Sequence, residues 1–148
     1  GTSSSQPVQD LLANANIRLL HNEHTVETIN RREINLVGVG DLWNDECNPN
    51  TAFAKLDDSR PTVLLSHNPD SKDLMRDHPW DLMLCGHRHG GQVFLPGLGA
   101  PLAPVKDKRY VRGLHRLDNR WLHISKGIGN LHGVRLNCRP EVSLLNVS

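Results

Sequence analysis

Two short apolar runs near the middle of the chain constrain its fold more than any other feature. They read TVLLS at residues 62–66 and DLMLCG at residues 81–86. Continuous apolar runs bounded by turn residues are typical of buried parallel strands. The segment 67–80 between them begins with helix-starting residues and carries the apolar positions Leu74 and Met75. The pattern therefore predicts a βαβ unit, in which the two strands lie parallel.

The remaining segments predict a mixed α/β domain. Apolar residues at helical spacing indicate a helix over residues 6–15, with Ser5 as its N-cap. Residues 40–60 are typical of a surface loop, with one helical turn around 51–56. Further strands are predicted at 17–20, 25–29, 34–39, 93–95, 109–117, 121–125 and 141–147. A chain of 148 residues is the size of one domain, so we count residues 1–148 as one domain.

The composition excludes some functions and leaves others open. The 17 basic and 16 acidic residues give a formal charge of +1, so no nucleic-acid partner is indicated. The cysteines are Cys47, Cys85 and Cys138, and their wide spacing predicts neither a disulfide framework nor a zinc knuckle. No apolar stretch approaches the roughly 20 residues of a membrane span. The start, GTSSSQ, has no initiator Met and no signal-peptide core.

Histidines follow both central strands, at the ends where α/β proteins bind ligands. His67 follows the first run, and His87 and His89 follow the second within the stretch LCGHRHGGQ. Side chains two residues apart point the same way on an extended chain, so His87 and His89 converge if the strand continues through them. The carboxyl ends of parallel strands meet at one edge of a sheet. Three imidazoles at that edge predict a metal site.

The neighbouring sequence offers support and alternatives. Three glycines would let this loop turn tightly and bring its backbone close to an ion or phosphate, namely Gly86, Gly90 and Gly91. Against this, an H-x-H pair also occurs as a surface pair without a ligand. The pair in HNEH (21–24) is a weaker metal candidate, GVGD (38–41) indicates a turn, and KDKRY (106–110) indicates a solvated face. We predict structural roles for His78, His115 and His123, and His132 is a minor site candidate.

Three motifs together identify a family resemblance. SHNPD (66–70), CGHRHGGQ (85–92) and KGIGNLHGVRLNCRPEVSLL (126–145) resemble the calcineurin-like metallophosphoesterases, in the bacterial branch of phosphodiesterases of the YaeI and YkuE type. The resemblance runs from the first predicted helix to the last predicted strand. It implies an α/β fold, a metallophosphoesterase-type β-sandwich of two mixed sheets flanked by helices.

The resemblance also implies a cofactor and a reaction. Two divalent metal ions (Mn, Zn or Fe) would be held about 3.5–4 Å apart, where they bind phosphate oxygens and a bridging hydroxide for in-line attack on phosphorus. By the family pattern, His67 and His87 bind one ion and His89 binds the other. The implied activity is a dimetal phosphodiesterase or phosphohydrolase, acting on a phosphoester substrate or a pyrophosphate bond.

The chain departs from the family pattern in two ways. Arg88 stands between the paired histidines, where the family commonly has a small residue, and we expect its guanidinium to contact a phosphate. The family's Asp-x-His, G-D-x-x-D and G-N-H-D/E motifs, which supply the remaining ligands, are absent. GDLWND (40–45) lies too late in the chain to be the second of these. We therefore expect the chain to be the C-terminal half of the domain, inactive alone and completed by the missing N-terminal half or by a second chain.

Two other functions and several details stay open at this stage. A non-catalytic scaffold of the same fold and a metallo-β-lactamase-like hydrolase are the alternatives. The second would need Asp-His shortly after the H-x-H pair, where Gly91 and Gln92 stand. The substrate could be a nucleotide, a simple phosphodiester or a lipid-linked pyrophosphate such as a UDP-diacylglucosamine. The family resemblance implies a membrane-associated or exported bacterial protein.

Overall fold

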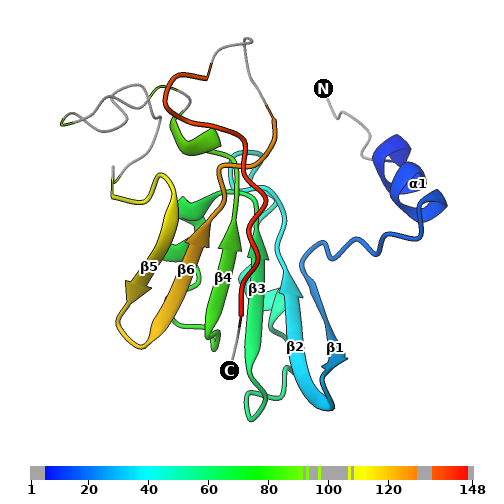
Figure 1. Ribbon diagram of the computed structural model, residues 1–148. Coiled ribbons are helices and arrows are strands. Elements are labelled where there is room, and N and C mark those ends of the chain that lie inside the picture. The colour runs from blue at the N-terminus through cyan, green and yellow to red at the C-terminus, as the bar shows by residue number, and fades with distance from the viewer. Residues whose placement is uncertain are drawn as a thin grey trace.

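A single mixed sheet of six strands organises the chain. The computed structural model describes residues 6–91, 93, 97, 107, 109–129 and 135–146. The strand order is β1-β2-β3-β4-β6-β5, as Figure 1 shows. The strands are β1 (Glu23–Ile29), β2 (Arg32–Gly38), β3 (Thr62–Ser66), β4 (Leu82–Cys85), β5 (Gly113–Leu117) and β6 (Arg120–Ile124). The α/β class predicted from the sequence is confirmed.

The pairing of the strands places four of them in one direction. β2, β3, β4 and β6 are parallel neighbours, while β1 and β5 run antiparallel at the two edges. The predicted parallel pair is confirmed, since Val63 of β3 pairs with Leu82 of β4 and Ser66 pairs with Cys85. The carboxyl ends of β3 and β4 therefore reach the same edge of the sheet side by side.

The connection between β3 and β4 is helical but tighter than predicted. It contains the 3₁₀ helix η1 (Pro69–Asp73), whose N-cap is Asn68. The Ser71 backbone N–H donates to the Asn68 carbonyl at 3.1 Å and the Ser71 hydroxyl donates to the same oxygen at 2.6 Å. Because a serine hydroxyl competes for local backbone groups, these bonds favour the three-residue turn over an α-helix.

The hydrophobic core lies on one face of the sheet. Its strand residues are apolar side chains pointing to that face, including Val37, Leu64, Met83, Leu122 and Ile124. The connecting segments cover them with Ala52 and Phe53, next to the short helix α2 (Pro49–Ala52), and with Met75 and Trp80 after η1. The predicted helical turn near residues 51–56 is thus present, and it packs against the sheet.

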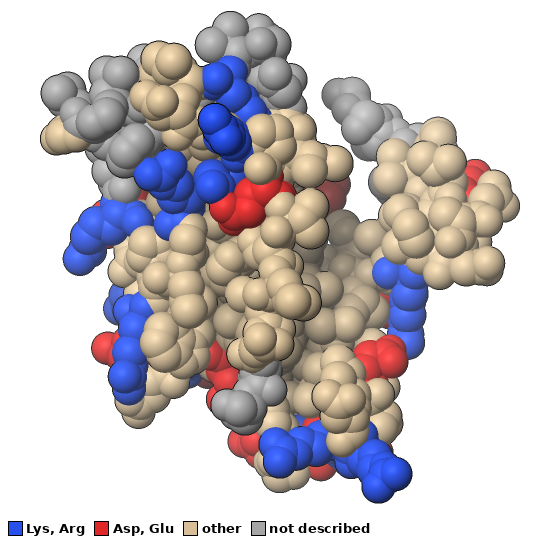
Figure 2. Space-filling view, in the orientation of Figure 1, with Lys and Arg blue, Asp and Glu red and all other residues tan. Residues whose placement is uncertain are grey.

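The opposite face of the sheet is only partly covered. The C-terminal segment runs along it (Figure 1), and together they line a groove of about 680 Å³ with Leu65, Leu84 and Leu145 among its walls. Figure 2 shows that the middle of this face carries neither acidic nor basic side chains, which gather at its upper and lower rims. This face is therefore apolar and open.

The strand predicted at residues 141–147 is wrong over its described part. Residues 141–146 form no regular secondary structure, and Val142 and Leu144 are each 90% exposed. The alternating pattern is there, but a strand needs a neighbour to accept and donate its backbone hydrogen bonds, and the ranges described here supply none. They also contain one sheet rather than the two of a sandwich.

The N-terminal region departs from the prediction in one element. The predicted helix is confirmed as α1 (Gln6–Asn14), which lies away from the sheet in Figure 1 with Val8 and Leu11 exposed. The strand predicted at residues 17–20 is wrong, because this stretch pairs with no strand. A Cβ atom on Gly38 would lie 2.5 Å from the Leu20 Cβ, so the stretch crosses β2 closely instead of extending the sheet.

None of the helices in the described ranges is long and apolar enough to cross a bilayer.

Candidate metal centre

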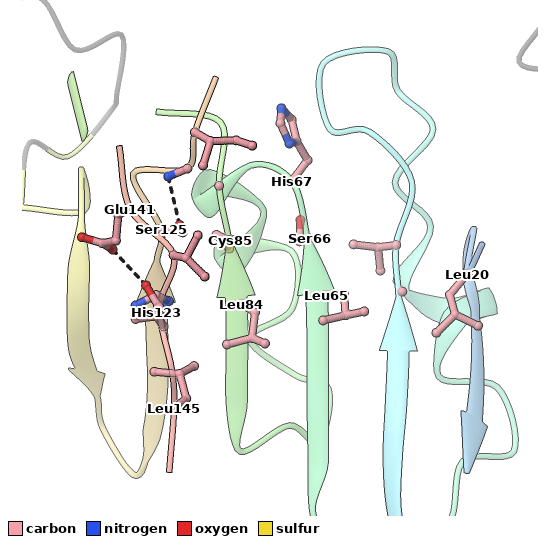
Figure 3. A pocket seen from close by; sticks show the side chains of 17 residues that line it. Leu20, Leu65, Ser66, His67, Leu84, Cys85, His123, Ser125, Glu141 and Leu145 are labelled. Atoms are coloured by element: carbon pink, nitrogen blue, oxygen red, sulfur yellow. Dashed lines mark hydrogen bonds between the residues drawn. The ribbon is translucent and has the colours of Figure 1, made fainter. Parts of the chain in front are cut away.

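Two histidines meet beyond the ends of neighbouring parallel strands. His67 follows β3 directly and His87 follows β4 after Gly86. Nδ1 of His87 lies 2.8 Å from Nε2 of His67, with the ring centroids 4.7 Å apart. Figure 3 shows His67 above Ser66 at the rim of the groove. The predicted meeting of these two side chains at one sheet edge is confirmed.

The surroundings of His87 favour its neutral form. Partial burial lowers the pKa of His87, and the nearby His67 and Arg88 lower it further, while Asp41 opposes them. A neutral imidazole has a lone pair on one ring nitrogen. In the His67–His87 hydrogen bond, one ring nitrogen donates the hydrogen and the other accepts it. If a metal ion took the place of this hydrogen, both nitrogens could bind the ion through their lone pairs.

The extended conformation predicted through His87 and His89 is wrong. His87 and His89 both adopt left-handed backbone conformations, with φ angles of 67° and 47°, so the chain turns at both residues and does not continue as a strand. His89 instead points to another loop, where its Nδ1 lies 2.9 Å from the carbonyl oxygen of Gly129. Alternation along a strand applies only while the chain stays extended.

The Gly129 carbonyl fixes the ring of His89. A carbonyl only accepts, so this contact needs a hydrogen on Nδ1 of His89, while Nη2 of Arg135, which only donates, lies 3.4 Å from the same nitrogen. Metal-binding histidines usually have this arrangement, with one ring nitrogen donating to a backbone carbonyl. Arg135 holds the loop in shape, because its guanidinium donates to the carbonyls of Lys126, Gly127 and Gly129.

The three histidines fit a metal in donor type but do not complete a site. Two imidazole nitrogens on one tetrahedral zinc are about 3.3 Å apart, given bonds of about 2.0–2.1 Å, so the His67–His87 pair needs to open by only about half an ångström. Among the residues that the structure describes, however, no group of three or more His, Cys, Asp or Glu side chains is gathered for an ion. The described residues therefore offer part of a site.

The structure places Arg88 away from the position predicted for a phosphate contact. Its side chain is 0% exposed, and Nη2 lies 2.6 Å from Oδ2 of Asp70 and 2.9 Å from Oδ1 of Asn68. A guanidinium buried in an ion pair cannot reach a phosphate in solvent without breaking that pair. The expectation of a phosphate contact is corrected accordingly.

Residues 86–91 form the loop that carries His87 and His89, called the histidine loop below. Glycine has a steric role at one end of this loop. Gly90 and Gly91 have φ angles of 64° and 81°, and a Cβ on Gly90 would lie 2.7 Å from Cγ of Lys126 and still closer to Sγ of Cys138. The predicted tight turn is confirmed at these two glycines. At Gly86 a Cβ would meet nothing within 4 Å, so that position does not require glycine for space.

Trp43 is a site neighbour that the sequence did not reveal. It belongs to the predicted loop 40–60, is 59% exposed, and meets His87 edge to face with the ring centroids 4.3 Å apart. Asp41 fixes it there by accepting a hydrogen bond from the Trp43 backbone N–H at 2.6 Å. Asn22 braces the same loop, since its Oδ1 accepts from the N–H groups of Gly40 and Asn48. The closeness of Trp43 to the two strand ends depends on the tertiary fold.

The weaker sequence candidates lie outside this site. His24 of HNEH contacts the carbonyl oxygen of Ala52 at 2.9 Å, which is a structural bond. The predicted structural roles of three other histidines are confirmed: His78 stacks on Phe53, His115 contacts the Arg112 carbonyl, and His123 is buried on β6. Arg109 of KDKRY pairs with Asp107. His132, residues 94–95 and Ser5 lie outside the described residues.

Comparisons with known proteins show which enzymes the chain is similar to. The chain is 48% identical to phosphodiesterase YaeI of Escherichia coli over 99% of its own length and 53% of that protein. The chain matches bacterial metallophosphoesterases of the YaeI type. It is also 31% identical to the UDP-2,3-diacylglucosamine pyrophosphatase LpxG of Chlamydia trachomatis over 91% of the chain, and 27% identical to the metallophosphoesterase YkuE of Bacillus subtilis over 83% of it.

These matches confirm the family resemblance seen in the sequence motifs, but they cover only part of each relative. The chain spans about half the length of the curated relatives it matches, with 53% of YaeI and 43% of LpxG covered. No family model matches the sequence. No solved structure matches it.

Proposed function

We propose that this chain contributes one side of the active site of a metal-dependent phosphoesterase. The observation that carries the proposal is the contact between His67 and His87 at the ends of two parallel strands, in a sequence that matches a phosphodiesterase over 99% of its length. The reaction would be hydrolysis of a phosphodiester, another phosphoester or a pyrophosphate bond, which are all attacked at phosphorus.

The three histidines divide between two ions in this proposal. His67 and His87 would hold one divalent ion, and His89 would hold its neighbour through Nε2, the nitrogen left free of the Gly129 bond. When bound, two such ions activate water and stabilise charge on the phosphate oxygens. Imidazole nitrogen suits zinc, manganese and iron alike, so the donor type does not choose among them.

The remaining ligands and the second sheet would come from elsewhere in the complete protein. We infer that the chain is the C-terminal half of a two-sheet sandwich, and that the N-terminal half of the domain or a second chain covers the open face. The apolar groove supports this, because its walls include Leu65 and Leu84 beside the rim that carries His67. Apolar surface of this kind is buried in a working fold.

The names of the relatives suggest candidate substrates for the complete protein. LpxG is named for the pyrophosphate bond of a UDP-diacylglucosamine, so a lipid-linked nucleotide pyrophosphate is one candidate substrate. YaeI is named a phosphodiesterase, which makes a simple phosphodiester the other. We infer a membrane-associated or exported bacterial protein from the family resemblance instead, since the names of the relatives do not give a location.

Two alternative functions are less well supported. A non-catalytic scaffold of the same fold would have no need of a His89 ring held by a backbone carbonyl, as metal-binding histidines usually are. A metallo-β-lactamase-like hydrolase would need its Asp-His pair just after the H-x-H motif, where Gly91 and Gln92 stand. A scaffold and an enzyme also differ in a measurable way, because a scaffold need not bind two ions.

Metal titration and turnover of the complete protein test the proposal. We expect the complete protein to bind two Mn²⁺ or Zn²⁺ ions by calorimetry and to hydrolyse bis(p-nitrophenyl) phosphate. His67→Gln and His87→Gln should each lower kcat/KM by about 100-fold or more and weaken ion binding, since losses of about 10–100-fold follow even from changes behind the ligands. His115→Gln is the matched control, because His115 contacts the Arg112 carbonyl and the Tyr110 ring rather than the histidine pair, and the change should leave both unchanged. Wild-type turnover in both ligand variants would contradict the proposal.

A further inference from the structure

Arg88 lies between two residues with an unusual backbone conformation. His87 and His89 on either side of it have φ angles of 67° and 47°. Residues other than glycine rarely adopt this left-handed region, and they stay there only where the surrounding structure holds them. Some contact must therefore fix the loop at or near Arg88.

The side chain of Arg88 provides that contact. It is 0% exposed, and its Nη2 donates to Oδ2 of Asp70 at 2.6 Å and to Oδ1 of Asn68 at 2.9 Å. Both acceptors belong to the segment that follows β3, where Asn68 also caps η1 by accepting from the Asp70 backbone N–H at 3.0 Å. The guanidinium thus joins the loop after β4 to the loop after β3.

The joined loops are the ones that carry His67 and His87. The Gly86 backbone N–H donates to the His67 carbonyl at 3.1 Å, which is a second link between the two loops. Asn68, Asp70 and Ser71 are all buried beneath them, and the Ser66 and Ser71 hydroxyls lie 2.7 Å apart. These hydrogen bonds join buried groups of both loops and favour one defined geometry, and within the described residues Nδ2 of Asn68 is left without a partner.

Arginine suits this buried place better than lysine. Its guanidinium stays charged and is more weakly hydrated than an ammonium, so its burial in an ion pair costs less. Here one nitrogen reaches the carboxylate and the amide oxygen together, from a side chain with no exposed surface. The same burial that removes Arg88 from a phosphate in solvent makes it a rigid support.

We propose that Arg88 is a positioning residue, whose buried ion pair with Asp70 holds the strained histidine loop so that His87 stands against His67. This inference rests on the proposed function, because it assigns Arg88 to the metal site through His87. Loss of the pair would let His87 and His89 relax from their left-handed conformations and separate the ligand nitrogens.

The test must separate positioning from stability, and a paired substitution does so in the complete protein. Arg88→Met together with Asp70→Leu removes both charges, so no unpaired charge remains buried. We expect this double variant to keep a metal-free Tm within a few degrees of wild type while its Kd for Mn²⁺ or Zn²⁺ rises about tenfold or more. Leu122→Ala is the matched control, because it damages the core on β6 and should lower Tm without changing Kd more than about twofold.

A second variant keeps the inference testable if the double variant does not fold. Asp70→Asn keeps the shape and an acceptor oxygen for Arg88 but removes the charge, and we expect it to raise Kd several-fold. Wild-type Kd in a folded double variant, or in Asp70→Asn, would overturn the positioning role and leave the proposed function standing. Failure of the wild-type protein to bind either ion would instead overturn the proposed function and this inference with it.

Discussion

Gly90 and Gly86 belong to the same loop but face different constraints. Gly90 has a φ angle of 64°, and a Cβ there would press on Lys126 and Cys138, whereas a Cβ on Gly86 would meet nothing within 4 Å. We predict that Gly90→Ala lowers the free energy of unfolding by about 1–3 kcal/mol. Gly86→Ala, the matched control, should change it by less than about 0.5 kcal/mol. Urea unfolding of both variants measures this, and equal losses would contradict the steric account.

The sequence could predict some of the candidate site and not the rest, for reasons visible at single residues. His67 and His87 could be predicted because both follow apolar runs that form parallel strands, and the strands bring them together. The position of His89 could not, because it depends on a left-handed backbone and on Gly129, which is 40 residues away in the chain. The contact of Trp43 with His87 likewise arises only in the tertiary fold.

Among the elements, those with local patterns were predictable and those that need a partner were not. The strands 62–66 and 81–86 were predicted almost to their observed bounds, since each is a compact apolar run between turn residues. Residues 141–147 have an equally clear alternation, yet residues 141–146 form no strand. A strand exists only through hydrogen bonds to a neighbour, and no sequence pattern within the segment records whether that neighbour is present.

The C-terminal segment depends on one ion pair at its start. Nζ of Lys126 lies 2.6 Å from Oε2 of Glu141, and the Glu141 N–H donates to the Gly127 carbonyl at 3.0 Å. Hydrogen bonding to Lys126 lowers the pKa of Glu141 below its ordinary value of 4.5. The folded state therefore binds fewer protons at this carboxyl than the unfolded state, so the pair stabilises the segment above about pH 4.5 and is lost as the pH falls through the lowered pKa.

A substitution at Glu141 should reproduce that loss at neutral pH. We predict that Glu141→Gln speeds amide hydrogen exchange at residue 141, whose N–H donates to the Gly127 carbonyl, at pH 7 while leaving the core strands β3 and β4 unchanged. Lowering the pH should speed exchange of the same amide in the wild-type protein, once the intrinsic effect of pH on exchange is corrected. Asp107→Asn, which breaks an exposed pair with Arg109, is the control and should not affect it. Exchange at residue 141 that is unaffected by Glu141→Gln would contradict this anchor.

At the scale of the whole molecule, the sheet has one packed face and one open apolar face. Leu84 lines the groove on the open face, whereas Leu74, in the connection that covers the packed face, is 50% exposed. If another part of the complete protein covers the groove, a charge at Leu84 becomes buried without a partner. We predict that Leu84→Asp lowers the free energy of unfolding of the complete protein by about 3 kcal/mol or more.

The control for that prediction is the same change at an exposed position on the packed side. Leu74→Asp should cost less than about 0.5 kcal/mol, as is usual for surface substitutions. Chemical denaturation of both variants gives the comparison. Equal, small losses would mean that water reaches the groove in the complete protein, and the inferred sandwich would then be wrong.

The insertion of β6 between β4 and β5 has a consequence for the order of folding. β1 to β4 follow one another in the sheet as they do in the chain, whereas Leu82 of β4 must find Trp121 of β6 across a long connection. Closing a long loop is slower than joining adjacent segments. We therefore expect the first four strands to assemble early and β6 to dock late. The histidine loop begins that long connection, so this part of the site would acquire its shape only in the last stage of folding.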